Sequence, residues 1–185
     1  MHKAVMLAGF AVTATLFAVR LPSYALTSEA VTEFVSAQAY MKPYTTAVML
    51  DYAPEGRYPH DGPSLSKEAF LFMHVTEYIG ARQPHIILNN YEADTKWFPL
   101  RWQPLRNPYT HLVDGPGFEG WLPTADFEKF RNETGRDVDY VLLWCLTQEL
   151  RQYEGVQLML GRLERDYMEI YVSEGTRMRL WQRKR

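Results

Sequence analysis

Three acidic side chains follow short apolar runs and could act as an acid and a base, or as oxygen ligands for a cation. Asp51 follows the run 47–50, while Glu92 and Asp94 follow the run 85–88. Such runs predict buried strands, and open α/β sheets place their sites beyond the carboxyl ends of strands. We therefore expect the three carboxylates at one sheet edge, as the catalytic candidates if the chain is an enzyme. The alternative, which we favour, is ordinary turn chemistry, because Asn and Asp commonly follow strands.

The segment 91–102 sets large aromatic rings among charged side chains. Ring faces stack on sugars, while polar side chains bind hydroxyl or phosphate groups, so the segment predicts a surface that binds a glycan or a lipid headgroup. An alternative interpretation is that the rings cover a sheet face or touch the membrane interface, where Trp is favoured. The candidate ligand-binding residues are Asn90, Tyr91, Glu92, Trp97, Arg101 and Trp102.

The histidines and the cysteine form no recognised catalytic pattern in the sequence. His60, His74, His85 and His111 lack the i, i+4 pairing of a helical zinc site, and we interpret His74 as a buried core residue. Cys145 lies in an apolar run, which predicts a buried, unreactive thiol. The sequence contains no phosphate loop, dinucleotide fingerprint or Gly-x-Ser-x-Gly elbow. We expect no metal and no cofactor, and we favour a protein that is not an enzyme.

The first 25 residues have the character of a membrane-directed leader. Residues 4–19 carry no charge, and all 22 acidic residues lie at or beyond Glu29. Sixteen residues at about 1.5 Å each span about 24 Å, and Arg20 can extend its charge to the headgroups, which predicts an uncleaved signal anchor. The alternative is a signal peptide cleaved near Ala25, with small residues before the cut.

Both alternatives divide the chain into residues 1–25, a signal anchor or signal peptide, and residues 26–185, a single extracytoplasmic domain. The domain then faces the periplasm or the cell exterior from a membrane anchor, or it is secreted or periplasmic after cleavage. Of 20 basic residues, two lie in the leader, so 18 basic residues face 22 acidic residues in the rest of the chain. An acidic chain that is 46 % apolar excludes a disordered protein and argues against binding to nucleic acid.

The elements that position these residues follow from hydrophobic periodicity. Helical spacing predicts helices over 27–42, 67–82, 124–131 and 149–167, with Thr27 or Ser28 capping the first and Thr124 the third. Short apolar runs predict strands over 47–52, 85–88, 139–144, 168–173 and 178–183. A strand, a helix and a strand imply a parallel pair, with the last strand antiparallel at an edge. The fold class is therefore α/β, with a small mixed, mainly parallel sheet flanked by helices and preceded by a membrane or signal helix.

Three local expectations depend on these elements. The run 70–73 is apolar on nearly all sides of its helix, which predicts that it is buried. The last turn, 174–177, contains Gly175, where a positive φ is easiest. Five basic residues and no acid follow from Arg177 onward, which predicts a charged edge strand that resists pairing with other chains.

Several motifs together carry a resemblance. They are Val19-Arg20-Leu21, the strand 48–52, Asn90-Tyr91-Glu92-Ala93 followed by Phe98-Pro99, the strand 138–144 and the hairpin 171–183. Their order resembles the C-terminal end of bacterial multi-span membrane proteins related to lipid-linked-sugar glycosyltransferases. The resemblance implies a last membrane helix followed by a small extracytoplasmic α/β domain. Such transferases have many membrane helices and place their catalytic acid in an early loop, so it implies a terminal piece or a stand-alone relative and carries over no catalytic residue.

The leading hypothesis is a non-catalytic, membrane-tethered or exported α/β domain that binds a partner or a glycan-like ligand through the segment 89–102. One alternative is a glycosyltransferase-related or hydrolytic enzyme that uses the acidic residues at strand ends. Another is a structural subunit of a membrane complex. The expected partners are the membrane, bound through the N-terminal helix, a glycan or lipid-linked sugar, and a membrane protein, with no nucleic acid among them.

Overall fold

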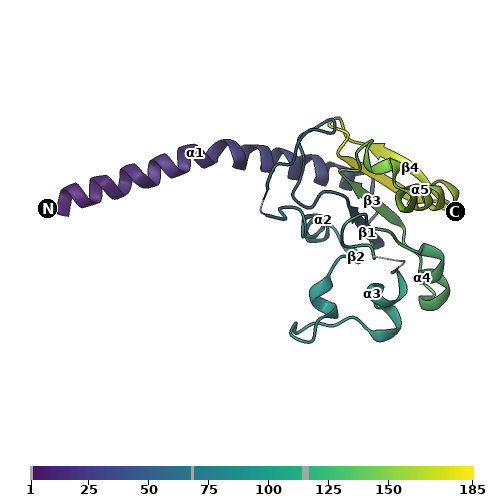
Figure 1. Cartoon of the computed structure of the whole chain (residues 1–185). Helices are drawn as coiled ribbons and strands as arrows, with labels where there is room; N and C mark the ends of the chain where they lie inside the picture. The colour runs from purple at the N-terminus through teal and green to yellow at the C-terminus, as the bar shows by residue number, and fades with distance from the viewer. Residues whose placement is uncertain (1, 68, 114–116) are drawn as a thin grey trace.

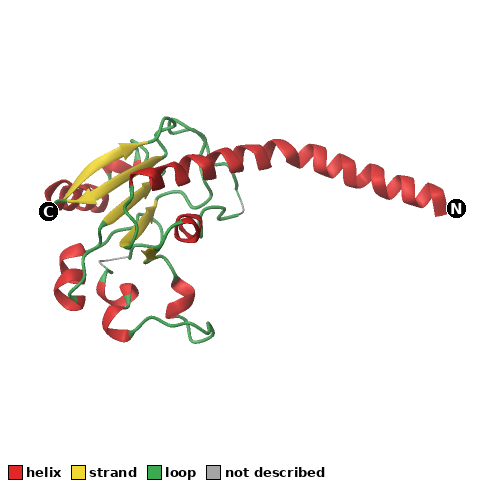
Figure 2. Cartoon of the chain, turned by 180° about the vertical axis from the view of Figure 1, so that it is seen from behind, coloured by secondary structure: helices red, strands yellow, loops and turns green. Residues whose placement is uncertain are grey.

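The computed structural model describes residues 2–67, 69–113 and 117–185, and it shows a long helix attached to a layered body (Figure 1). Helix α1 (His2–Ser36) continues into the short 3₁₀ helix η1 (Ala37–Tyr40). The N-terminal part of α1 projects away from the body in both views (Figures 1 and 2), and full burial of its side chains begins at Ala30. The N-terminal helix and the α/β class are therefore as expected.

The expected separate helix over 27–42 is wrong, because leader and helix are continuous. Pro22 lies inside α1. Thr27 does not cap a new helix, and its hydroxyl donates to the carbonyl oxygen of Ser23 at 2.9 Å. Pro22 has no backbone N–H, so α1 lacks one hydrogen bond there. The helix continues because good helix formers such as Arg20 and Leu21 precede it.

Within the described residues, one helix is long and apolar enough to cross a membrane. It is the segment Lys3–Tyr40, whose most apolar window has a mean hydropathy of 1.9 and is not buried in the body. A signal sequence near the N-terminus has the same length and composition, so this helix suits an anchor and a signal peptide alike.

The body contains one five-stranded sheet in the order β2-β1-β3-β5-β4. Its strands are β1 (Thr45–Asp51), β2 (His85–Ile87), β3 (Tyr140–Trp144), β4 (Tyr167–Val172) and β5 (Met178–Arg183). Strands β2, β1 and β3 are parallel, while β5 runs antiparallel to both β3 and β4. The small mixed, mainly parallel sheet is confirmed.

The expectation that the last strand lies at the edge is wrong, because β5 lies between β3 and β4. Met178 and Leu180 of β5 are fully buried, whereas Met168 of the edge strand β4 is exposed. The basic side chains of β5 form ion pairs instead of protecting an edge. Arg179 contacts Glu169 across the hairpin at 3.0 Å, and Arg183 contacts Asp137 at 3.2 Å.

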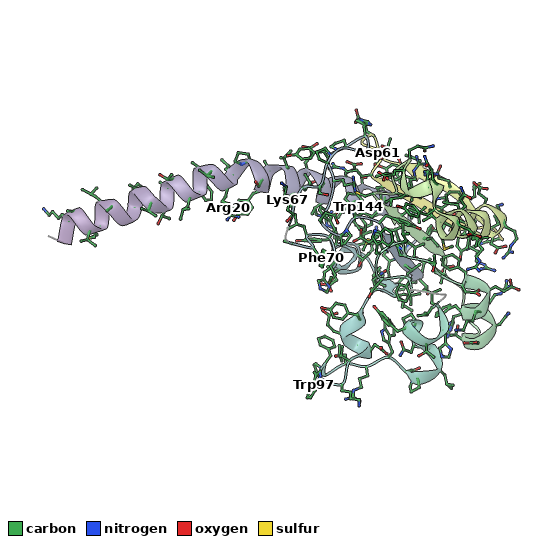
Figure 3. The ribbon with its side chains drawn as sticks, in the orientation of Figure 1. Arg20, Asp61, Lys67, Phe70, Trp97 and Trp144 are labelled. Atoms are coloured by element: carbon green, nitrogen blue, oxygen red, sulfur yellow. The ribbon has the colours of Figure 1, made fainter. Side chains whose placement is uncertain are left out.

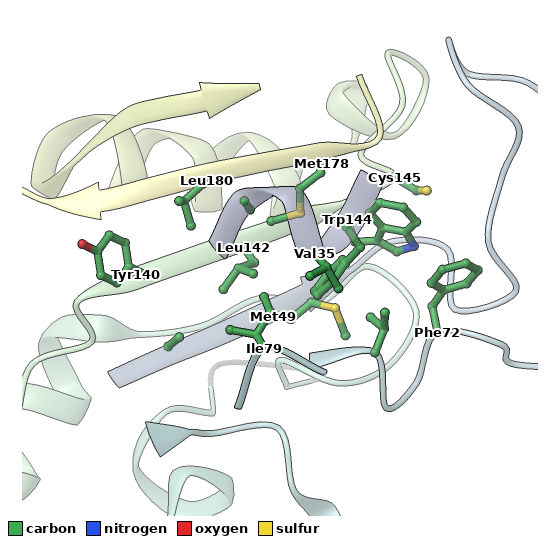
Figure 4. Close-up of a cluster of buried hydrophobic side chains, with 14 of the residues drawn as sticks. Val35, Met49, Phe72, Ile79, Tyr140, Leu142, Trp144, Cys145, Met178 and Leu180 are labelled. Atoms are coloured by element: carbon green, nitrogen blue, oxygen red, sulfur yellow. The ribbon is translucent and has the colours of Figure 1, made fainter. Parts of the chain in front are cut away.

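Helices cover both faces of the sheet and produce three layers. The remaining elements are α2 (Thr76–Arg82), η2 (Tyr91–Asp94), η3 (Pro104–Arg106), α3 (Pro108–His111), α4 (Phe127–Thr134), η4 (Leu150–Gln152) and α5 (Glu154–Asp166). On one face, Phe34 of α1 and Ile79 of α2 pack in a cluster with Met49 of β1 (Figure 4). On the other face, Phe130 of α4 and Leu163 of α5 belong to the second cluster.

The expected buried helix over 67–82 is wrong in its first half. Of the residues that the structure describes in this range, which leave out residue 68, only Thr76–Arg82 is helical, as α2. Phe72 is fully buried and its ring lies 5.0 Å from that of Trp144, but Phe70 is 66 % exposed. Phe34 of α1 also packs on Trp144, at 5.4 Å between the rings, so Phe72 fills the remaining space and its apolar neighbours stay at the surface.

Two shorter predictions also need correction. Helix α4 is capped by Asp126, whose carboxylate accepts from the backbone N–H of Lys129 at 2.8 Å, and not by Thr124. Strand β2 is as expected in position, but Ile86 is 57 % exposed because β2 is an edge strand.

The turn between β4 and β5 is shaped by α1. The positive φ falls on Thr176, at 59°, and not on Gly175 as predicted. Gly175 serves a close approach, since a Cβ there would lie 2.5 Å from Oε2 of Glu33. The sequence therefore needs glycine at this position because the carboxylate of Glu33 occupies the space of a side chain.

That carboxylate forms a buried ion pair with Arg177, whose side chain is 4 % exposed. The guanidinium Nε of Arg177 donates to Oε2 of Glu33 at 2.7 Å, and the backbone N–H of Arg177 donates to Oε1 at 3.1 Å. The hydroxyl of Ser173 also donates to Oε1. Both carboxylate oxygens thus have donors, which is the condition under which a buried charge is tolerated.

We predict that Gly175→Ala lowers the free energy of unfolding by about 1–3 kcal/mol, because the new methyl group must displace Glu33 from Arg177. Urea unfolding of the full chain in detergent micelles, followed by Trp fluorescence, measures this change.

Gly161→Ala is the matched control. Gly161 lies inside α5 and a Cβ there meets nothing within 4 Å. We expect this variant to gain about 0.5–1 kcal/mol from helix propensity. Equal responses of the two variants would show that the approach of Glu33 does not restrict position 175.

Candidate functional site

A cavity of about 680 Å³ lies where β1 ends, at the carboxyl edge of the parallel strands. Its charged and amide side chains are Asp51, Glu55, Arg57, Asn89 and Glu119. Its apolar wall includes Phe70, Met73, Trp121 and Leu150. The cavity therefore combines an acidic polar floor with an apolar wall, at the place where open α/β sheets bind ligands.

Asn89 builds the floor by extending the sheet with its side chain. The amide oxygen of Asn89 accepts from the backbone N–H of Met49 at 2.6 Å, and its amide nitrogen donates to the carbonyl oxygen of Met49 at 3.0 Å. The same nitrogen donates to a carboxylate oxygen of Glu119 at 3.2 Å. A side-chain amide thus replaces the next peptide of β2 and holds Glu119 at the cavity.

Asp51 is the acidic residue placed deepest in this edge. Its Oδ1 accepts from the backbone N–H of Ala53 at 3.0 Å, which is the turn chemistry expected at a strand end. Burial raises the pKa of Asp51 from 3.8 to about 7, the hydrogen bond from Ala53 opposes this, and the charges of Glu55 and Glu119 add to it. The carboxyl group can therefore gain and lose a proton near neutral pH.

Glu119 lies at the exposed rim, and its carboxylate points back toward Asn89. Partial burial of the carboxyl group raises the pKa of Glu119, while its hydrogen bonds lower it and the charge of Glu92 raises it. The charge of Glu119 is the smallest of the effects that raise the pKa of Asp51, so both carboxyl groups line one cavity with only a weak influence of Glu119 on the ionisation of Asp51. Such a pair can donate and accept hydrogen bonds toward hydroxyl groups.

The three predicted catalytic carboxylates occupy different surroundings. Asp51 lines the cavity. Glu92 lies beside it, with its Oε1 3.6 Å from Nε2 of His74, and its charge acts on Glu119. Asp94 accepts from the amide of Asn107 at 2.6 Å on the exposed surface. The structure therefore brings Asp51 and Glu92 toward Glu119 and leaves Asp94 outside.

The six predicted ligand-binding residues divide among several places. Tyr91 lines the cavity. Asn90 caps η2, and its side chain accepts from the backbone N–H of Ala93. Arg101 and Trp102 line a second cavity of about 610 Å³ beside β2. Trp97 is 93 % exposed and lies at an outer end of the body (Figure 3).

Two predictions about single residues have opposite outcomes. The interpretation of His74 as a buried core residue is wrong, since its side chain is 41 % exposed and its Nδ1 lies 3.3 Å from Glu77. Cys145 is buried, as expected, and burial raises the pKa of its thiol.

The residues that sequence reasoning missed are Asn89 as a builder of the floor, together with Glu119, Trp121 and Phe70. Glu119 and Trp121 lie in an irregular segment, where Gly117 and Gly120 adopt positive φ. Those glycines mark a tight turn, but nothing in the sequence connects that turn to Asn89. Phe70 lies in the first half of the predicted helix over 67–82, and in the structure Phe70 is not helical.

Among residues 2–67, 69–113 and 117–185, no group of three His, Cys, Asp or Glu side chains could hold a metal ion. The fold and the cavity define a three-layer α/β domain with a carboxyl-edge cavity and an apolar N-terminal helix. No family model, no curated protein and no solved structure matches the chain. The relation to lipid-linked-sugar glycosyltransferases stays a prediction.

We predict that the stability of the body falls as pH rises from about 4 to about 7, in part because of Asp51. In this range the unfolded chain has lost the proton that the folded chain still holds, so each pH unit lowers the free energy of unfolding by about 1.4 kcal/mol for this one group. Below pH 4 both states are protonated, and above pH 7 both are ionised, so the contribution is constant there.

Urea unfolding of the wild type and of Asp51→Asn at several pH values isolates this contribution. Asn keeps the acceptor for Ala53 but cannot ionise. The difference in stability between the two proteins should grow in favour of Asn as pH rises through this range. A difference that does not depend on pH would contradict a buried, proton-holding Asp51.

Proposed function

We propose that the chain is a non-catalytic, membrane-tethered domain that binds a small glycan-like ligand with an apolar portion in the carboxyl-edge cavity. The observation that carries the proposal is the composition of that cavity. Asp51, Asn89 and Glu119 form a polar floor, and an apolar wall containing Trp121 stands beside it. The ligand class is the one expected from the sequence, while the site moves from the segment 89–102 to the cavity.

The floor suits hydroxyl groups better than a permanent anion. Two carboxyl groups with raised pKa values would repel an anion when ionised, but in either protonation state they can hydrogen-bond a hydroxyl. The wall suits an aliphatic chain or the apolar face of a sugar ring, because Trp121 and Phe70 are both exposed. A lipid-linked sugar has both parts.

The tether is α1, and the proposed orientation places the body on the periplasmic or outer side. The unburied, apolar Lys3–Tyr40 segment supports an anchor. Lys3 at the short end agrees with a cytoplasmic N-terminus. If the leader is instead cleaved, the same binding domain is released on that side. The hypothesis of a structural subunit is tested separately by co-purification, which should recover a membrane protein together with the chain.

A hydrolytic or glycosyltransferase-related enzyme is the second candidate. It is favoured by one observation, the pKa of Asp51 near 7 beside a second carboxyl group, since a general acid or base works best with a pKa near the operating pH. Under this proposal Asp51 would transfer the proton and Glu119 would tune its pKa. If the wild type hydrolyses hexyl β-D-glucoside and releases hexanol, and Asp51→Asn does not, the chain is an enzyme and the proposal of a non-catalytic binding domain is overturned.

We predict that hexyl β-D-glucoside binds the full chain in lipid nanodiscs more tightly than glucose or hexanol does, because only the glycoside meets both floor and wall. Isothermal titration calorimetry measures the three affinities. Trp121→Ala should weaken glycoside binding about tenfold, equal to a loss of about 1.4 kcal/mol.

Trp97→Ala is the matched control, since it removes an equally large exposed ring that is not part of the cavity wall. If glycoside binding depends on Trp97 and not on Trp121, the binding site is the segment 89–102 and not the cavity. Absence of binding by all three probes would overturn the proposed ligand class.

A further inference from the structure

Exposed apolar side chains gather on the side of the body from which α1 projects. Figure 3 shows Lys67, Phe70 and Trp97 on that side, with Lys67 close to the helix and Trp97 farthest from it. The C-terminus lies at the opposite end of the body (Figure 1). If α1 enters a bilayer, this side is the one that faces the lipid headgroups.

The first apolar group is a projecting loop with a fixed base. The backbone N–H of Trp102 donates to the carbonyl oxygen of Ala93 at 3.1 Å, and its indole N–H donates to that of Asn90, also at 3.1 Å. A third hydrogen bond stabilises the loop between these residues: the guanidinium of Arg101 donates to the carbonyl oxygen of Lys96 at 2.9 Å. The structure thus holds Trp97 outward in a secured loop.

Trp97 is 93 % exposed, and Leu100 of the same loop is also exposed. The fastened loop keeps both side chains in water, so their apolar surface is available to contact lipid. The cations of this loop, Lys96 and Arg101, are exposed beside the ring. Tryptophan flanked by basic residues is the combination favoured at the boundary between headgroups and acyl chains.

The second apolar group comes from a different part of the chain. The buried ring of Phe72 and its backbone N–H, which donates to the carbonyl oxygen of Pro54 at 2.9 Å, fix the segment in place. Phe70 and Leu71 consequently face outward, and Lys67 is exposed close to them in sequence. Two separate loops thus present the same pairing of apolar and basic side chains on one side of the body.

The acidic residues nearest to the first loop are already engaged. Glu92 pairs with His74, and the carboxylate of Asp94 accepts from Asn107 at 2.6 Å. The segment 91–102 carries Glu92 and Asp94 as well as Lys96 and Arg101, so its formal charge is zero and its exposed apolar side chains must provide most of the contact with lipid.

We infer that these two loops form a membrane-docking surface, made of Lys67, Phe70, Leu71, Lys96, Trp97, Leu100 and Arg101, which contacts the bilayer that α1 enters. The rings and aliphatic chains lie among the headgroups, and the basic side chains contact lipid phosphates. The helix and the surface bind the same bilayer, so the helix holds the loops close to it and their individually weak contacts become effective. The inference rests on the tether of the proposed function and not on the ligand.

Environment-sensitive labels on the full chain test the surface. Single cysteines are introduced as Trp97→Cys, Leu100→Cys, Val12→Cys and Arg185→Cys, labelled with NBD, and reconstituted in phosphatidylcholine–phosphatidylglycerol vesicles. The wild type treated with NBD in the same way serves as the blank and should take up little label, because Cys145 is buried. Val12 lies in the apolar run of α1 and reports the tether, whereas Arg185 at the C-terminus is the control on the far end.

We expect labels at positions 97 and 100 to emit at shorter wavelength than the label at 185, and to be quenched by lipids that carry a spin label near the headgroup. The label at position 12 should be quenched by lipids labelled deep in the acyl chain. Leu100→Cys keeps Trp97, so it tests the surface even if loss of that ring alters the loop.

A lipid environment at position 12 with water-like emission at both 97 and 100 would overturn the docking surface and leave the tether intact. Water-like emission at all three positions would overturn the tether together with the surface. Neither pattern bears on the cavity, whose ligand is measured separately with hexyl β-D-glucoside.

Discussion

The buried ion pair between Glu33 and Arg177 is the contact on which the arrangement of this molecule depends. It joins the end of the N-terminal helix to the turn before β5, two segments far apart in the sequence. The guanidinium of Arg177 also donates to the carbonyl oxygen of Arg57, whose side chain lines the carboxyl-edge cavity. Helix, hairpin and cavity rim thus meet at one pair of charges. Leaving either charge unpaired in such a place typically costs about 3–5 kcal/mol, so alternative placements of the helix are strongly disfavoured.

The ion pair also explains why the loop over 54–66 is ordered without regular structure. The backbone N–H of His60 donates to the carbonyl oxygen of Gly175 at 3.0 Å, and Asp61 accepts from the backbone N–H of Gln148 at 3.1 Å. The loop is therefore fastened to the turn that Glu33 shapes and to the segment after β3. One wall of the cavity consequently depends on a helix that begins at the N-terminus.

The sequence predicts most of the sheet. A short run of consecutive apolar residues such as 140–144 is buried on both faces when it forms a central strand covered by helices on either side. The sequence does not predict the strand order. The apolar character of β4 resembles that of a central strand, yet β5 occupies the inner position, where it pairs with β3. The ion pair between Arg177, directly before β5, and Glu33 of α1 agrees with this order. These pairings link distant segments, and local pattern carries no information about them.

The candidate site divides in the same manner. The position of Asp51 follows from the rule that sites lie beyond the carboxyl ends of strands. The cavity floor does not follow from that rule. Its side-chain amide hydrogen bonds join Asn89 to the backbone of Met49 and to Glu119, which lies 30 residues further along the chain. The interpretation of 70–73 as buried fails for a related reason. Of these four residues only Phe72 is buried, because Trp144 packs between Phe72 and Phe34 of α1, and the size of that space is a tertiary property.

Phe70 belongs both to the cavity wall and to the side of the body from which α1 projects. A ligand held on the floor by Asp51 and Glu119 would extend its apolar part along a wall that continues toward that side. For a free sugar this continuity brings no advantage. For a sugar carried on a lipid it does, because the apolar chain could remain in the bilayer while the polar part enters the cavity. The shared position of Phe70 therefore favours a membrane-borne ligand over a soluble one, given the tether and the docking surface.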